Sequence, residues 1–65
     1  MEAQILRLPA VRSSVGLSKS QIYALVARGE FPPPFKLSAR ASGWDAAAVQ
    51  AWIADRIRRS RKAAA

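Results

Sequence analysis

The fold of this chain is decided by the stretch Gly16-Leu17-Ser18-Lys19-Ser20-Gln21-Ile22-Tyr23. Gly16 readily adopts the left-handed conformation that ends a helix, and Ser18 is a good N-cap for the next helix. Gln21 stands three residues after Ser18, where its side chain can complete a capping box. The stretch therefore predicts that one helix ends and a second begins after a turn of about three residues, which is the spacing of a helix-turn-helix.

Helices are predicted on both sides of this turn. The first, over residues 8–15, has apolar residues at three- and four-residue intervals, and Pro9 lies in its first turn, where no backbone N–H is needed. The second, over residues 18–28, carries one apolar stripe centred on Ile22 and ends before Gly29. Both segments are short, so they must pack against the rest of the chain to be stable.

The segment after the second helix predicts a stiff connection followed by a small hairpin. Three consecutive prolines at residues 32–34 cannot continue a helix and favour an extended path. Residues 35–37 alternate apolar and polar side chains, residues 38–42 are small and polar, and residues 42–44 can return as a second strand. We expect a two-stranded β-hairpin here, the wing of a winged helix.

A third helix is predicted to begin after Asp45, a suitable N-cap, and to run to about Arg59, where its apolar stripe stops. Trp52 lies on this stripe, so we expect it in the core, and we assign Trp44 to the core as well. Together these elements predict a mostly helical α+β fold: a small winged helix-turn-helix of three helices and a two-stranded wing.

Charge is concentrated at one end of the chain. Its 65 residues include 11 Lys and Arg against 4 Asp and Glu, a net charge of +7. Five basic residues lie in the last ten positions, namely Arg56, Arg58, Arg59, Arg61 and Lys62. We expect one folded domain over residues 1–59 and a basic, alanine-rich, disordered tail over residues 60–65. The net charge favours a polyanionic partner, either nucleic acid or an anionic membrane surface.

The composition excludes several classes of function. The chain has no His and no Cys, so it cannot form a disulfide, a thiolate nucleophile or the usual zinc and haem sites. Its four carboxylates are scattered, and no glycine-rich phosphate loop is present, so we expect no enzyme, no metal or cofactor and no small-molecule substrate. Without a signal peptide or a long apolar run, we expect a soluble cytoplasmic protein with no membrane partner.

A helix-turn-helix places the start of its second helix near base edges in the major groove, while a wing reaches phosphates or the minor groove. The candidate DNA-binding residues on these elements are Ser18, Lys19, Ser20, Tyr23, Arg28, Lys36 and Arg40. Lys19 and Arg28 also fit a solvated helix face, Ser18 fits a capping role alone, and wing cations can simply prevent sheets from associating. The order helix, turn, helix, hairpin and helix favours contact with DNA.

The pattern resembles a known family. It resembles the AlpA family of small phage-type regulators at residues 6–9, 16–23, 29–37, 43–44 and 49–53. The resemblance covers roughly residues 5–56. The Phe-Pro-Pro-Pro-Phe-Lys stretch at residues 31–36 also resembles the lambda-type phage excisionases, which share a MerR-like winged-helix fold.

This resemblance implies a sequence-specific regulator of a prophage or mobile genetic element, associated with the bacterial nucleoid. The alternative that it implies is an excisionase that bends attachment-site DNA for an integrase. In such families the helix matching residues 18–28 enters the major groove, and the wing residue matching Arg40 reaches the adjacent minor groove or backbone.

The chain departs from the family pattern where Ala24 and Ala27 stand on the second helix, since neither offers a polar group to a base edge. Ala48 likewise replaces a common acidic residue near the start of the third helix. We therefore expect backbone contacts, DNA shape and cooperative self-association on DNA to carry much of the affinity, with the basic residues from Arg56 to Lys62 touching DNA or a neighbouring protomer. Two rival classes stay open: an RNA-binding peptide and a module that binds an acidic protein or an anionic membrane.

Overall fold

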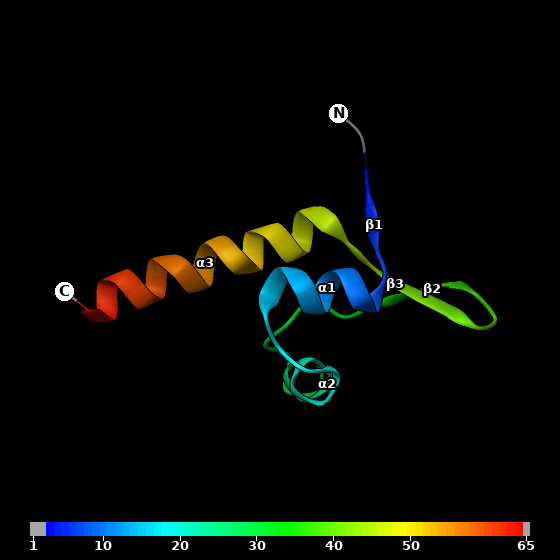
Figure 1. Ribbon diagram of the computed structural model, residues 1–65, viewed down its shortest axis with the longest axis horizontal. Helices are drawn as coiled ribbons and strands as arrows, with labels where there is room; N and C mark the ends of the chain where they lie inside the picture. The colour runs from blue at the N-terminus through cyan, green and yellow to red at the C-terminus, as the bar shows by residue number, and fades with distance from the viewer. Residues whose placement is uncertain (1–2, 65) are drawn as a thin grey trace.

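The computed structural model describes residues 3–64, with side chains as far as Arg61. It shows a small α+β fold with three helices and an antiparallel sheet, as the sequence predicts (Figure 1). The elements along the chain are β1 (Ile5–Leu6), α1 (Leu8–Val15), α2 (Lys19–Ala27), β2 (Phe35–Ser38), β3 (Ala41–Asp45) and α3 (Ala46–Ala64).

The turn between α1 and α2 forms as its residues predict. Gly16 has φ 72° and ends α1 in the left-handed conformation. The Gln21 N–H donates to Ser18 Oγ at 3.2 Å, and the Ser18 N–H donates to Gln21 Oε1 at 2.9 Å, which completes the capping box. Gly29, with φ 73°, follows the end of α2. The capping box sets where α2 begins, Gly29 follows its end in the left-handed conformation, and the predicted helix-turn-helix is confirmed.

The sheet contains one strand more than the predicted hairpin. β3 lies in the middle and pairs with β2 on one side and β1 on the other, with Leu6 opposite Trp44 and Phe35 opposite Gly43. β1 is only two residues long, so it has no readable alternation, and its pairing partner lies far along the chain. Gly43 is needed where three strands meet, because a Cβ there would lie 2.5 Å from Ile5 Cγ2.

The core lies between the sheet and the helices. Its buried members are Val11, Ile22, Phe31, Trp44 and Val49. Trp44 is only 1% exposed, and its Nε1–H donates to the Pro32 carbonyl at 2.9 Å. The prediction that Trp44 belongs to the core is therefore confirmed.

Trp52 differs from Trp44 because it is only half-buried and packs against the edge of the core. Its Nε1–H donates to the Glu30 carbonyl at 2.7 Å, and its ring meets Phe31 edge-on with centroids 4.9 Å apart. Both tryptophans thus hold the stiff segment that leaves α2, which positions α2 between the wing and α3.

α3 begins as expected but continues further than the sequence predicts. The Ala47 N–H donates to Asp45 Oδ1 at 3.1 Å, as expected for an N-cap. The helix runs past Arg59 to Ala64, so the predicted end is wrong, and the reason is that Arg, Lys and Ala favour a helix even without an apolar stripe. The boundary between a domain of residues 1–59 and a tail of residues 60–65 stays a prediction, and Ala65 lies outside the described residues.

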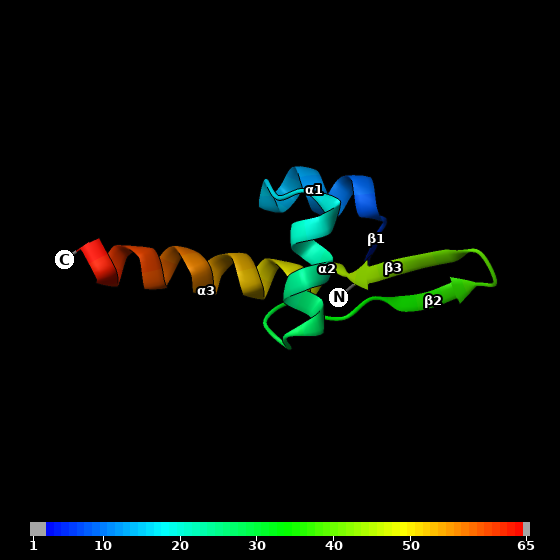
Figure 2. The ribbon, with the colours of Figure 1, turned by 90° about the horizontal axis from the view of Figure 1, so that it is seen from below.

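The molecule is elongated, with extents of 45 × 31 × 19 Å. In Figures 1 and 2 the β2–β3 hairpin and the far end of α3 extend from the body in opposite directions along the longest axis. α2 lies between them, on one side of the body and nearly perpendicular to that axis. α2 is therefore flanked by two arms, the β2–β3 hairpin on one side and the far end of α3 on the other.

Candidate nucleic-acid interface

The outer face of α2 is lined by small side chains. Ile22 is buried, and at 100° per residue the side directly opposite carries Ser20, Ala24 and Ala27, all exposed. A helix with such a face can bring its backbone close to another surface. It offers few long side chains for reading bases, as the alanines in the sequence predict.

The first turn of α2 brings together three predicted residues, Ser18, Lys19 and Ser20, all of them exposed. The oxygen of Ser18 is already occupied as the cap, because it accepts the Gln21 N–H. The positive end of the helix dipole and the Lys19 ammonium lie at the same end of α2. This turn is electrostatically suited to a phosphate beside the groove.

Tyr23 lies on the side of α2 that faces the sheet. Its ring contacts Trp44 with centroids 6.0 Å apart and an interplanar angle of 59°, while 39% of the residue stays exposed. The ring is therefore held in place by the core. Such a preorganised phenol can donate to a phosphate or base edge without losing much conformational freedom on binding.

Arg28 lies at the other end of α2, apart from the first turn. It caps the helix and forms an ion pair with Glu30 at 3.5 Å, with the two side chains 61% and 51% exposed. An exposed pair of this kind contributes little to stability. The Arg28 guanidinium can therefore exchange its carboxylate partner for a phosphate.

The wing carries the remaining two predicted residues. Lys36 lies opposite Ser42 in the sheet, and Ser42 is on the same face as Trp44, two residues further along β3. Because Trp44 contacts Tyr23 of α2 from this face, Lys36 projects from the face on which α2 packs. Arg40 is exposed in the tight turn that joins β2 to β3. Both cations lie on the arm that extends beyond α2.

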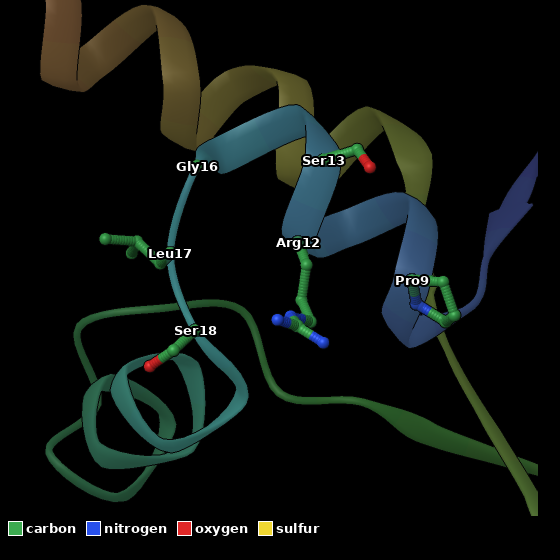
Figure 3. A pocket seen from close by; sticks show the side chains of 6 residues that line it. All are labelled: Pro9, Arg12, Ser13, Gly16, Leu17 and Ser18. Carbon is green, nitrogen blue, oxygen red and sulfur yellow. The ribbon is translucent and has the colours of Figure 1, made fainter.

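An open hollow of about 550 Å³ separates α1 from the start of α2. Figure 3 shows Arg12 pointing from α1 into this space, while the hydroxyl of Ser18 at the start of α2 points away from it. The sequence patterns do not predict Arg12 as a site residue. The sequence signal for Arg12 is its place one helical turn before Gly16, where the Arg12 carbonyl accepts the Gly16 N–H, and the structure puts its side chain in the hollow beside the helix-turn-helix turn.

A second hollow, of about 260 Å³, lies between the end of α2 and α3. It is lined by Gly29, Glu30, Trp52, Asp55, Arg56 and Arg59. A hydrogen bond from Arg58 lowers the pKa of Asp55; desolvation opposes this shift, and the charge of Arg59 adds to it. Arg56 lies over the Trp52 ring, 4.8 Å from its centroid. The cations here are oriented by neighbours on their own helix.

The described residues hold no arrangement suited to metal binding. Between residues 3 and 64, no group of three His, Cys, Asp or Glu side chains lies together. The three described carboxylates each have a partner: Glu30 and Asp55 bind arginines, and Asp45 caps α3. In the same part of the chain, no helix is both long and apolar enough to cross a membrane.

Comparison with known proteins gives two matches. The family model described as prophage CP4-57 regulatory protein (AlpA) matches residues 4–57, which include every predicted site residue. The uncharacterized protein ORF88 of Enterobacteria phage P4 is 43% identical over 56 residues, covering 86% of this chain. The chain spans 64% of the length of that relative.

Proposed function

Because the chain belongs to the AlpA family of prophage regulatory proteins, we propose that it is a transcriptional regulator that binds double-stranded DNA. α2 lies in the major groove, and the β2–β3 wing contacts the adjacent minor groove or backbone. The residues that make these contacts are Ser18, Lys19, Ser20, Tyr23, Arg28, Lys36 and Arg40. Arg12, beside the start of α2, adds a contact to a phosphate.

The observation that carries this proposal is the position of α2. Its exposed face is flanked by the cationic wing, and its first turn combines the helix dipole with Lys19. In Figure 1 α2 is seen end-on at the lower edge of the body, with α1 and α3 on its other side, so its outer side faces away from the other helices and is free to enter a major groove.

Specificity in this proposal comes largely from backbone contacts and DNA shape. Ala24 and Ala27 have no polar head, so the centre of α2 makes apolar contacts, such as those that fit a thymine methyl group. Cations on α2 and the wing hold phosphates at fixed positions, which rewards DNA whose groove width matches the protein. Several copies binding side by side raise the affinity further.

The proposed regulator carries out no catalytic step, and it works in the bacterial cytoplasm at the nucleoid. The regulatory role by which the family is described supports this assignment, as does the engagement of the described carboxylates in capping and ion pairs. Neither a cofactor nor a small-molecule substrate is required for the binding of DNA.

A footprint on DNA from the protein's own genetic element, at about 150 mM salt, tests the proposal because weak phosphate attraction is largely screened there. We expect discrete protected repeats beside a promoter. Protection at an attachment site, with excision by an integrase depending on the protein, would instead identify an excisionase. Uniform or absent protection would contradict sequence-specific binding and would direct attention to RNA or an acidic protein.

A further inference from the structure

The far half of α3 forms a second cationic arm. It runs on beyond the part of the helix that packs against the core, whose last member is Ile53. Four arginines lie on it within the described side chains: Arg56, Arg58, Arg59 and Arg61. Figure 2 shows this arm extending from the body on the side opposite to the wing.

The direction of this arm relative to α2 determines what it can reach. A helix lying in the major groove runs across the DNA axis, and α2 is nearly perpendicular to the longest axis of the molecule. Because α2 also lies at the lower edge of the body in Figure 1, placing it in the groove brings the longest axis roughly parallel to the DNA. Its 45 Å extent exceeds the roughly 34 Å of one helical turn, so the two arms reach the backbone on both sides of one major groove.

The tilt of α3 brings its arginines toward the DNA. In Figure 1 the helix begins on the side of the body away from α2 and descends toward the level of α2 at its far end. The wing lies at a similar level on the other side. α2 projects furthest between them. This arrangement allows α2 to enter a major groove while the two arms contact the phosphate backbone on either side of it.

The chemistry of the arm fits phosphate. The side chains of Arg58 and Arg59 are 76% and 70% exposed, and one carboxylate, Asp55, binds both of them at 2.7 and 2.9 Å. Exposed ion pairs are weak, so phosphates can compete for these guanidiniums. Ile57 is the single large apolar side chain exposed on this arm within the described residues, which disfavours an apolar partner there.

We propose that the far half of α3 is a second DNA-binding arm, which holds the phosphate backbone on the side of the major groove opposite to the wing. The inference rests on the proposed function and adds to it a contact surface that lies apart from the winged helix. Arg58, Arg59 and Arg61 each bind a phosphate in this proposal. The stretch of DNA in contact with the protein is therefore longer than the stretch that α2 and the wing alone would cover.

Hydroxyl-radical footprinting of a duplex with a single binding site tests the arm directly. The wild-type chain should protect backbone on both sides of the groove that α2 occupies. The triple variant Arg58→Gln, Arg59→Gln, Arg61→Gln should lose protection on one side only and keep the rest. Its salt slope should fall by about 0.9 for each phosphate that the variant no longer binds. Glutamine preserves helix propensity, so circular dichroism should stay unchanged.

A matched control is the triple variant Arg58→Lys, Arg59→Lys, Arg61→Lys, which keeps the charge and should restore both the protection and most of the salt slope. Equal footprints for the glutamine variant and the wild type would overturn the arm while leaving the proposed function intact. So would a glutamine variant that binds one site normally and loses only cooperativity between adjacent sites, because α3 would then touch a neighbouring copy. Absence of any wild-type footprint would overturn both proposals.

Discussion

α2 and the far half of α3 are built in opposite ways. α2 is closed at its start by a capping box, buried along one side by Ile22 and lined on the other by small side chains. Among its described side chains, which end at Arg61, the far half of α3 contributes none to the core and includes four arginines. Stability and charge are therefore placed in different parts of the molecule. A groove-reading helix needs a fixed position, whereas a phosphate-binding arm needs charge and reach.

The core that fixes α2 can be broken by Trp44→Ala, which should have the largest effect of any single substitution proposed for this chain. Removing a fully buried Trp costs about 3 to 5 kcal/mol, against a small total stability for a domain of this size. The variant should therefore be unfolded at room temperature. Circular dichroism followed during heating should show no cooperative transition.

Trp52→Ala is the matched control for Trp44→Ala, because Trp52 is half-buried at the edge of the same core. It should lower the midpoint of unfolding while leaving a folded protein. If the two variants were equally unfolded, the distinction between the central and the peripheral tryptophan would be wrong.

Lys19→Ala and Arg40→Ala should each weaken DNA binding several-fold and leave circular dichroism unchanged. Each removes one proposed phosphate contact from α2 or the wing, so the salt slope should fall by about 0.9 in each case. Fluorescence anisotropy at several salt concentrations measures this slope. The controls Lys19→Arg and Arg40→Lys keep the charge and should bind nearly as well as wild type. Normal binding by both alanine variants would show that DNA binds a different face of the molecule.

Ser18→Ala should cost about 1 kcal/mol of stability, because the first turn of α2 loses its cap. Urea denaturation measures the loss. Ser14→Ala, an exposed change within α1, should stay within about 0.5 kcal/mol of wild type. Equal stabilities for the two variants would mean that the capping box does not hold the start of α2.

Lowering the pH is expected to have the smallest effect, a slight loss of helix in α3. Arg58 and Arg59 lower the pKa of Asp55 in the folded chain, so their pairing stabilises α3 when Asp55 is ionised. That contribution is present above the ordinary value of 3.8 and is lost as the pH falls through the lower folded pKa. Circular dichroism should show a slight loss of helix in that window, and Asp55→Asn should abolish this step. A loss centred near neutral pH would contradict it.

The sequence predicted the parts of the fold that local chemistry determines. Gly16, Ser18 and Gln21 indicate the helix-turn-helix within one short stretch, and each makes the bond or conformation expected of it. β1 could not be predicted, because a two-residue strand is defined only by its pairing with β3. The end of α3 was missed because the apolar stripe stops while helix propensity does not.

In the candidate site, too, the sequence predicts only the parts that local patterns determine. The first turn of α2 and the wing follow from local patterns, so their residues could be selected from the sequence. Arg12 lies next to α2 only through the turn at Gly16, and the reach of α3 depends on where the folded body ends. Both features depend on the tertiary structure, which no local sequence pattern determines. Contact with DNA stays a prediction for each of these residues.

An NMR titration of labelled protein with a duplex containing its site, at about 150 mM salt, tests the central claim most directly. Binding through α2 predicts large, saturating shifts at the amides of Lys19, Ser20 and Tyr23 and in the wing turn at Arg40, with smaller shifts along the end of α3. Shifts confined to the arginines of α3, rising without saturation on any duplex, would contradict it and leave only a basic helix attracted to phosphates.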